Sequence, residues 1–206
     1  KSTLINLIPR AWDITSGNIF IGGKDIKKIP LNVLRRSIGI VPQESFLFST
    51  TIEKNISYSG DEISEEEVIK AARQSGLYKD VEDFPDKFKT VLGERGITLS
   101  GGQKQRTSIA RAIYKKPDIL ILDDSLSAVD TKTEEEILRQ LKEVMKDKTS
   151  IIISHRISTI KNANNIIVIS HNKIAEEGTH NELISAGGIY FDLYKKQLLE
   201  EEIKEF

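Results

Sequence analysis

Several short stretches of this sequence carry side chains that could bind a nucleotide and cleave its terminal phosphate. Lys1, Ser2 and Thr3 precede an apolar run and match the end of the phosphate-loop pattern G-x-x-x-x-G-K-[ST]. In that pattern the lysine contacts phosphate oxygens and the hydroxyl binds Mg²⁺. The same three residues also fit an ordinary helix start capped by Ser or Thr. The rest of the chain therefore has to decide between the two interpretations.

Three apolar segments end in polar residues. Gln43 follows "IGIVP", His155 follows "IIIS", and the pair Asp123 and Asp124 follows "ILIL". In open α/β sheets, ligands bind beyond the carboxyl ends of the strands, so we expect these side chains to converge on one site. An acid after a buried strand commonly holds Mg²⁺ in phosphate-loop enzymes. The alternative is that Asp123 only caps the next turn.

The segment "LSGGQKQR" places small residues at a predicted helix start. Ser100, Gly101 and Gly102 stand just before a helix that we expect to begin near Gln103. Small residues let backbone amides approach an anion, and the N-terminus of a helix adds partial positive charge. A glycine turn with an ordinary helix cap would explain the same residues.

The elements that must position these residues alternate between apolar strands and helices. The patterns predict strands within 17–26, 37–43, 118–124 and 150–155, a hairpin over 165–178, and helices over 4–8, 31–37, 64–76, 103–116, 131–146, 179–187 and from 189 onward. A glycine turn should divide 17–26 into two short strands, and capping boxes at Ser64–Glu67 and Thr179–Glu182 should start two of the helices. This alternation predicts an α/β fold with a mainly parallel sheet flanked by helices. From about 51 to 96 the signals are helical, which predicts a helical subdomain inserted in the α/β core.

Composition narrows the class of protein. The 206 residues suffice for one domain with a small subdomain, and 30 Lys and Arg balance 31 Asp and Glu to a net charge of -1. This balance gives no electrostatic reason to expect nucleic acid as a partner. Without cysteine the chain has no disulfides, thiolate metal sites or cysteine nucleophiles. No apolar run approaches the roughly 20 residues that span a bilayer.

Two motifs together point to a family. LSGGQ is followed 20 residues later (123 minus 103) by Asp123, at the end of an apolar strand. With this pair, the chain resembles the nucleotide-binding domain of an ABC transporter over essentially its whole length, 1–206, as a single ATPase domain. The stretch "IPLNVLRRSIGIVPQESFLFSTTIEKNI" is most similar to exporters of the multidrug and lipid type. The resemblance implies a P-loop NTPase-like fold whose helical subdomain carries the ABC signature.

The resemblance also implies that the domain is partial. The strand and glycines that precede the lysine in this family do not stand before Lys1, and neither does the aromatic residue that stacks on adenine. We therefore expect the N-terminal strands of the fold to be missing, and the 206-residue chain alone to bind ATP weakly and to be inactive. Trp12 does not replace the missing aromatic residue, and we expect it to pack against the protein.

Roles for the polar residues follow from the resemblance. Lys1, Ser2 and Thr3 resemble the end of Walker A, which binds the phosphates of ATP. Ser2 would also ligate Mg²⁺, with the Walker B Asp123 and the Q-loop Gln43 completing its surroundings. Gln43 would take part in catalysis as well.

Two further catalytic positions and two loops are implied in the same way. Asp124 stands where hydrolytically competent members usually carry Glu, and His155 resembles the switch histidine. "SAVD" (127–130) resembles the D-loop. "GERG" (93–96) resembles the exporter loop before the signature. Two positions before its first glycine, where this loop often carries Glu, this chain has Val91.

Partners are implied too. In this family ATP lies between two nucleotide-binding domains arranged head to tail, so Ser100, Gly101, Gly102 and Gln103 would bind the nucleotide of the opposite subunit. The second domain, the transmembrane domain of an exporter and a place at the cytoplasmic face of the cell membrane are all expected, with no nucleic acid. Because Asp is one methylene shorter than Glu, Asp124 predicts a slow site and a heterodimer.

Alternatives from other classes remain open at this point. One is a regulatory half that binds ATP but scarcely hydrolyses it. Another is a soluble ABC ATPase of DNA repair or chromosome organisation. Such proteins typically carry a long coiled coil between the Q-loop and the signature. Here only 56 positions (99 minus 43) separate Gln43 from Leu99, and they show no heptad pattern. A generic phosphate-loop kinase would have no use for LSGGQ.

Overall fold

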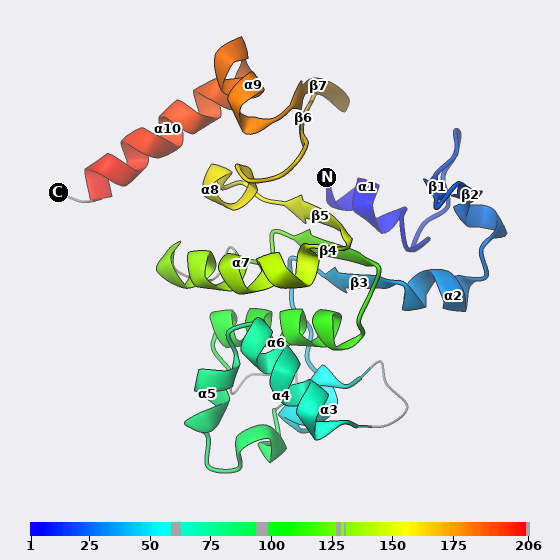
Figure 1. Ribbon diagram of the computed structural model, residues 1–206, viewed down its shortest axis with the longest axis vertical. Coiled ribbons are helices and arrows are strands. Elements are labelled where there is room, and N and C mark those ends of the chain that lie inside the picture. The colour runs from blue at the N-terminus through cyan, green and yellow to red at the C-terminus, as the bar shows by residue number, and fades with distance from the viewer. Residues whose placement is uncertain (59–62, 94–98, 127–128, 130, 205–206) are drawn as a thin grey trace. The chain divides into compact units, whose positions relative to one another are not determined.

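The computed structural model describes residues 1–58, 63–93, 99–126, 129 and 131–204 (Figure 1). The chain divides into two compact units, 2–152 and 153–206, with Lys1 grouped with the second. The first unit contains the helices α1 (Ser2–Asn6), α2 (Leu31–Arg36), α3 (Ile52–Ile56), α4 (Glu65–Gln74), α5 (Tyr78–Glu82), α6 (Gly101–Tyr114) and α7 (Thr131–Met145). Its strands are β1 (Phe20–Ile21), β2 (Lys24–Asp25), β3 (Ile38–Val41), β4 (Ile119–Asp123) and β5 (Thr149–Ile153), whose last residue belongs to the second unit.

The central sheet has the strand order β3-β4-β5. β3 and β4 are parallel, with Ile38 opposite Ile119 and Val41 opposite Leu122. Every residue of β4 is buried, as expected for a strand that is covered on both faces. The parallel pair and its flanking helices confirm the predicted P-loop NTPase-like α/β fold (Figure 1). β1 and β2 form a separate antiparallel pair around the predicted glycine turn.

Helix α6 lies close against β3. Side chains of α6 and α7 and of the two parallel strands form one apolar core, which includes Val41, Ile109, Ile113, Leu120, Leu122, Ile137 and Leu141. A Cβ atom on Gly39 would stand 2.8 Å from the carbonyl oxygen of Ala112 and 2.8 Å from Cγ of Pro117. Glycine is therefore what allows the C-terminal turn of α6 to approach this strand.

The stretch after residue 51 is helical where it is described. α3, α4, α5 and a 3-10 helix (Lys87–Lys89) share a second apolar core with Leu92, Leu99 and Ala110. One isolated bridge, Thr51 with Val91, is the only strand-like pairing found among the described residues of 51–93. The subdomain boundaries of 51 and 96 stay a prediction.

The cap of α4 differs from the expected reciprocal capping box. The hydroxyl of Ser64 accepts a hydrogen bond from the Glu67 amide, as predicted. The Glu67 carboxylate forms an ion pair with Lys116 at 2.9 Å instead of reaching back to the cap. The bond to Lys116 is also the main reason why the pKa of Glu67 is lowered. An ion pair with a residue distant in sequence has replaced the local bond.

The second unit consists of α8 (Ile157–Ile160), β6 (Ile166–Ser170), β7 (Lys173–Gly178), α9 (His180–Ala186) and α10 (Ile189–Lys204). β6 and β7 form the predicted antiparallel hairpin. Its two-residue turn has His171 and Asn172 at φ of 50° and 59°, the left-handed pair typical of a tight hairpin. Thr179 and Glu182 form the predicted capping box of α9. Among the described residues, none of the helices has the length and apolar character needed to cross a membrane.

The prediction that Trp12 packs against the protein is wrong. Its side chain is 66% exposed. Trp12 lies after α1, in a stretch without regular secondary structure. The buried residue of α1 is Ile5. The apolar character of Trp12 alone could not indicate whether a neighbouring element covers it.

Candidate functional site

Gln43 and Asp123 lie at the same edge of the central sheet. Val41 pairs with Leu122 near the end of the parallel ladder, so Gln43 follows β3 at the edge where Asp123 completes β4. Gln43 is exposed, whereas Asp123 is buried, with 6% of its surface accessible. The strand register therefore brings an amide and a buried carboxylate to neighbouring positions.

The carboxylate of Asp123 has no hydrogen bond or ion pair with any of the described residues. The oxygens of Asp123 are not among the fully buried side-chain atoms that lack a partner in the described part of the chain, so the carboxylate keeps some contact with solvent. An accessible carboxylate can bind a cation, and Asp123 is the residue of the sheet edge best suited to hold one.

Three of the predicted site residues carry oxygen atoms that suit Mg²⁺. Mg²⁺ prefers oxygen ligands in octahedral geometry and keeps several of its waters. The Asp123 carboxylate, the Gln43 amide oxygen and the Ser2 hydroxyl are all oxygen donors of this kind. No cluster of three or more His, Asp or Glu side chains able to hold a metal is found in the described part of the chain, so such a site would rest on mixed oxygen ligands and water.

The start of α1 is accessible. Ser2 is half-buried as the first residue of the helix, and Lys1 and Thr3 are exposed. Among the described residues, no hydrogen bond joins Ser2 or Thr3 to Asp123. The structure thus leaves these side chains open to a ligand but does not itself link them to the sheet edge.

The backbone turns sharply away from the strand at Asp124. Its φ of 46° lies in the left-handed region, which Asp tolerates better than most residues because its short side chain can bond locally. Asp124 is half-buried and has an interaction partner within the protein. Backbone strain of this kind is frequent at catalytic positions. The sharp turn places Asp124 directly beyond the buried Asp123.

The turn before α6 is a complete capping box. The Ser100 hydroxyl accepts a hydrogen bond from the Gln103 amide at 3.2 Å, and the Gln103 side-chain oxygen accepts one from the Ser100 amide at 3.0 Å. A hydroxyl that accepts through a lone pair keeps its hydrogen for a second bond. Ser100 and Gly101 are exposed, so this hydrogen and the neighbouring amides can face a partner molecule.

Gln103 also faces the helical stretch. Its amide nitrogen donates to Asp80 of α5 at 3.3 Å, and Arg106 donates to the same carboxylate through Nε at 3.0 Å and Nη2 at 2.7 Å. Both ends of the Gln103 side chain are therefore engaged within the protein. We expect Gln103 to shape the turn that presents Ser100, and its predicted contact with nucleotide stays a prediction.

His155 lies in the second unit, in the loop between β5 and α8. Its side chain is exposed. Its backbone carbonyl accepts a hydrogen bond of 2.5 Å from the side chain of Gln197 on α10. The loop that carries this histidine is thus held by a residue that the sequence did not single out.

A family model described as ABC transporter matches residues 1–127. The chain belongs to the ABC transporter family. Along the chain, the turn with Ser100 lies between Gln43 and Asp123, which share one edge of the parallel sheet.

Known exporters are similar to this ABC domain along nearly its whole length. An ATP-dependent lipid A-core flippase of Syntrophus aciditrophicus is 45% identical over 205 residues, which are 100% of this chain and 34% of the flippase. The iron-sulfur clusters transporter ATM1 of Chaetomium globosum is 43% identical over 199 residues, 96% of this chain and 33% of the transporter. A solved structure of a bacterial Atm1-family ABC exporter with ATP bound matches with a TM-score of 0.93 and 41% identity, covering 96% of this chain and 35% of the exporter. The chain thus spans about a third of the length of these relatives.

Two predicted loops lie outside the described residues. Of the D-loop, residues 127, 128 and 130 are not described, and of "GERG" only Gly93 is. Val91, at the position where the family often carries Glu, is 64% exposed. The roles of these segments stay predictions.

A buried polar cluster after the Q-loop was missed by the sequence analysis. Arg111 of α6 donates through Nε to the Asn55 carbonyl at 2.7 Å, through Nη2 to the Asn55 side-chain oxygen at 2.8 Å and through Nη1 to the Phe46 carbonyl at 2.8 Å. Asn55 is fully buried and also bonds to the backbone of Phe48. A signal was present, because Asn55 lies three residues after Ile52 on the apolar face of a helix.

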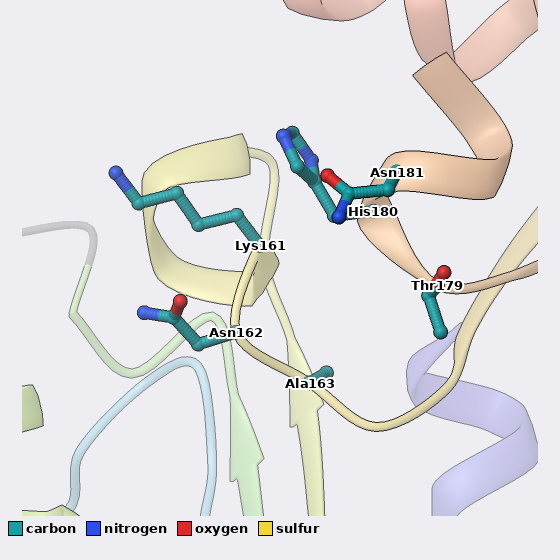
Figure 2. A pocket seen from close by; sticks show the side chains of 6 residues that line it. All are labelled: Lys161, Asn162, Ala163, Thr179, His180 and Asn181. Carbon is teal, nitrogen blue, oxygen red and sulfur yellow. The ribbon is translucent and has the colours of Figure 1, made fainter. Parts of the chain in front are cut away.

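A small surface hollow of the second unit contains none of the predicted site residues. It lies between the end of α8 and the start of α9 (Figure 2) and is lined by Lys161, Asn162, Ala163, Thr179, His180 and Asn181. Its volume is about 280 Å³. None of the six is buried, and the imidazole Nδ1 of His180 lies 2.8 Å from the hydroxyl of Tyr190. We assign no binding role to this hollow.

Proposed function

We propose that this ABC domain binds and hydrolyses ATP to power a membrane exporter. The carboxylate of Asp123 carries the proposal. It stands at the carboxyl end of a parallel strand, at the same sheet edge as Gln43 and without a protein partner in the described ranges, and a carboxylate in this position suits a ligand of Mg²⁺. The similarity to a lipid A-core flippase and to transporters of the Atm1 type supports export as the work done.

The residues would divide the chemistry between them. Lys1 would neutralise charge on the β- and γ-phosphates, and Ser2, Gln43 and Asp123 would hold Mg²⁺, which when bound offsets further phosphate charge. Asp124 would orient the attacking water and accept its proton. Because phosphoryl transfer depends mostly on positioning and charge neutralisation, these side chains need little motion once ATP is bound.

His155 would complete the site. Its exposed imidazole would hold the γ-phosphate and the attacking water by hydrogen bonds, the role that the resemblance to the switch histidine implies. We expect His155→Ala to lower the rate of hydrolysis far more than the affinity for ATP.

The Ser100 turn would serve a second subunit. Its hydroxyl hydrogen and the amides beside Gly101 and Gly102 would bind the γ-phosphate held by the opposite domain in a head-to-tail dimer. Closing that dimer excludes water and strengthens the electrostatic contacts. We propose that the closure drives the transmembrane domains, with this domain at the cytoplasmic face of the membrane.

We further propose a heterodimer in which this chain's own Walker site is the slow one. Asp124 holds its carboxylate one methylene short of a Glu, and the loss of general-base assistance typically costs roughly 10²- to 10⁴-fold in rate. The Ser100 turn is intact, so it would complete a fast site on a partner that carries Glu at the matching position. A regulatory half that binds ATP with little hydrolysis is the second candidate, and Asp124 favours it too.

The test uses the full-length complex. We expect Glu→Gln at the partner's catalytic position nearly to abolish hydrolysis, and Asp124→Glu in this chain to raise the turnover of its own site. If Asp124→Glu leaves that site without hydrolysis, the regulatory function is favoured. Brisk ATPase activity from a homodimer of the full-length parent would contradict the proposed division of labour.

A further inference from the structure

The side-chain amide of Gln197 binds the backbone of the His155 loop at two points. Its nitrogen donates to the His155 carbonyl at 2.5 Å, and its oxygen accepts from the Ile157 amide at 2.8 Å. Ile157 is the first residue of α8, so its amide has no acceptor within that helix. One amide group thus bridges both sides of Arg156.

The rest of this loop depends on side chains as well. The Ser154 hydroxyl accepts a hydrogen bond from the Arg156 amide at 2.9 Å and donates to the Thr159 hydroxyl at 3.2 Å. The His155 side chain is exposed, so packing does not hold its ring. The position of the imidazole therefore depends on the backbone, and the Gln197 side chain holds that backbone at His155 itself.

Helix α10, which carries Gln197, is anchored in the core of the second unit. Tyr190 at the start of the helix is 2% exposed, belongs to the core of the second unit and lies with its hydroxyl 2.8 Å from His180. Glu176 accepts hydrogen bonds from the first amides of the helix, including that of Tyr190 at 3.0 Å. Tyr190, Tyr194 and Gln197 follow at the spacing of one helix face, so the anchored face is the one that carries the amide.

We propose that Gln197 is a positioning residue for His155 and sets the rate of hydrolysis from the C-terminal helix. The inference rests on the proposed role of His155. Gln197 would act only through the loop backbone and not by contact with substrate. A shift of α10 would move the histidine relative to the γ-phosphate, and a displacement of about 1 Å at such a group can cost up to 10²-fold in rate.

The test uses the full-length transporter with Asp124→Glu in this chain and the partner's catalytic carboxylate changed to an amide, so that hydrolysis reports on the site of His155. We expect Gln197→Ala to lower kcat about ten-fold while KM for ATP stays within about two-fold. Lys196→Ala is the matched control, because Lys196 is the preceding residue of α10 with a 75% exposed side chain, and it should leave both constants unchanged.

Two further variants separate positioning from simple helix docking. Gln197→Glu keeps an acceptor for Ile157 but sets a carboxylate oxygen against the His155 carbonyl, so we expect it to be as slow as Gln197→Ala. Wild-type kcat in Gln197→Glu would overturn the proposal, because the bond to His155 would then be dispensable.

A double variant tests whether Gln197 acts through His155. In the His155→Ala background, Gln197→Ala should cost no further activity, since its effect passes through the histidine. A full additional ten-fold loss there would overturn the proposal. Normal hydrolysis by His155→Ala alone would remove the role of His155 and this inference with it, while binding and hydrolysis of ATP at the site would stand.

Discussion

Replacing Arg111 tests how the signature helix α6 is joined to the segment after the Q-loop. Arg111 makes three hydrogen bonds to Asn55 and Phe46, at 2.7 to 2.8 Å. Its guanidinium also lies over the rings of Phe48 and Tyr58, at 5.4 and 5.9 Å from their centroids. Burial of the guanidinium lowers the pKa of Arg111. We consider Arg111→Met, which keeps length and apolar contact but removes every donor.

The expected loss of stability depends on which of the three acceptors would be left without a donor. The Phe46 bond is exposed, so water can replace it, and the Asn55 side-chain oxygen still accepts from the Phe48 amide at 2.8 Å. Among the described residues, the Asn55 carbonyl near the end of α3 is then left without a donor, at a cost of about 1–3 kcal/mol. The loss of the cation–π contacts adds about 0.5–1 kcal/mol, and relief of the buried charge offsets part of this sum. We expect the free energy of unfolding to fall by about 2 kcal/mol.

Urea unfolding of the purified domain measures this change through the midpoint, at a slope that should not vary between variants. Arg111→Lys keeps the charge but cannot form the fork of three bonds, so it should lose about 1 kcal/mol. Arg139→Met, at an exposed arginine of α7, is the control and should stay within about 0.5 kcal/mol of wild type. If Arg111→Met matched that control, the cluster would not hold the two segments together.

Three further predictions concern the signature turn, the sheet and the second unit. In the full-length complex, Ser100→Arg should block closure over the opposite subunit's nucleotide and abolish ATPase activity and transport; normal transport would show that Ser100 does not serve the partner. Gly39→Ala should destabilise the domain by about 2–4 kcal/mol in urea, because the new methyl group would collide with the Ala112 carbonyl, which is backbone and cannot turn aside. Hydrogen bonds from the Thr179 amide and hydroxyl lower the pKa of Glu182 in the folded protein below its usual 4.5. The ionised Glu182 therefore stabilises the fold fully above pH 4.5, and this contribution is lost as the pH falls through the lower pKa of the folded state. Melting temperatures at about pH 7 and about pH 3 should therefore differ less for Glu182→Gln than for wild type, and an unchanged difference would contradict the assignment.

Local pattern determined most of the secondary structure of this chain. The apolar runs that became β3, β4 and β5, the glycine turn between β1 and β2, the hairpin of β6 and β7 and the capping box of α9 were all predicted. Each depends on residues close together in the sequence, through alternation, turn chemistry or a cap three residues away. The family also followed from sequence, since LSGGQ and the strand ending in Asp123 are contiguous motifs.

Only the tertiary structure decided which polar groups meet across the chain. Glu67 bonded Lys116 instead of its own cap, Asn55 met Arg111 from a helix 56 residues away, and Gln197 reached back 42 residues to His155. Such pairs depend on how elements pack, and a single sequence carries no periodic signal for the distance between them. Whether a side chain is buried also depends on how the elements pack. Asp123 is buried and Trp12 exposed because neighbouring elements cover one and not the other, which the chemistry of either side chain alone does not reveal.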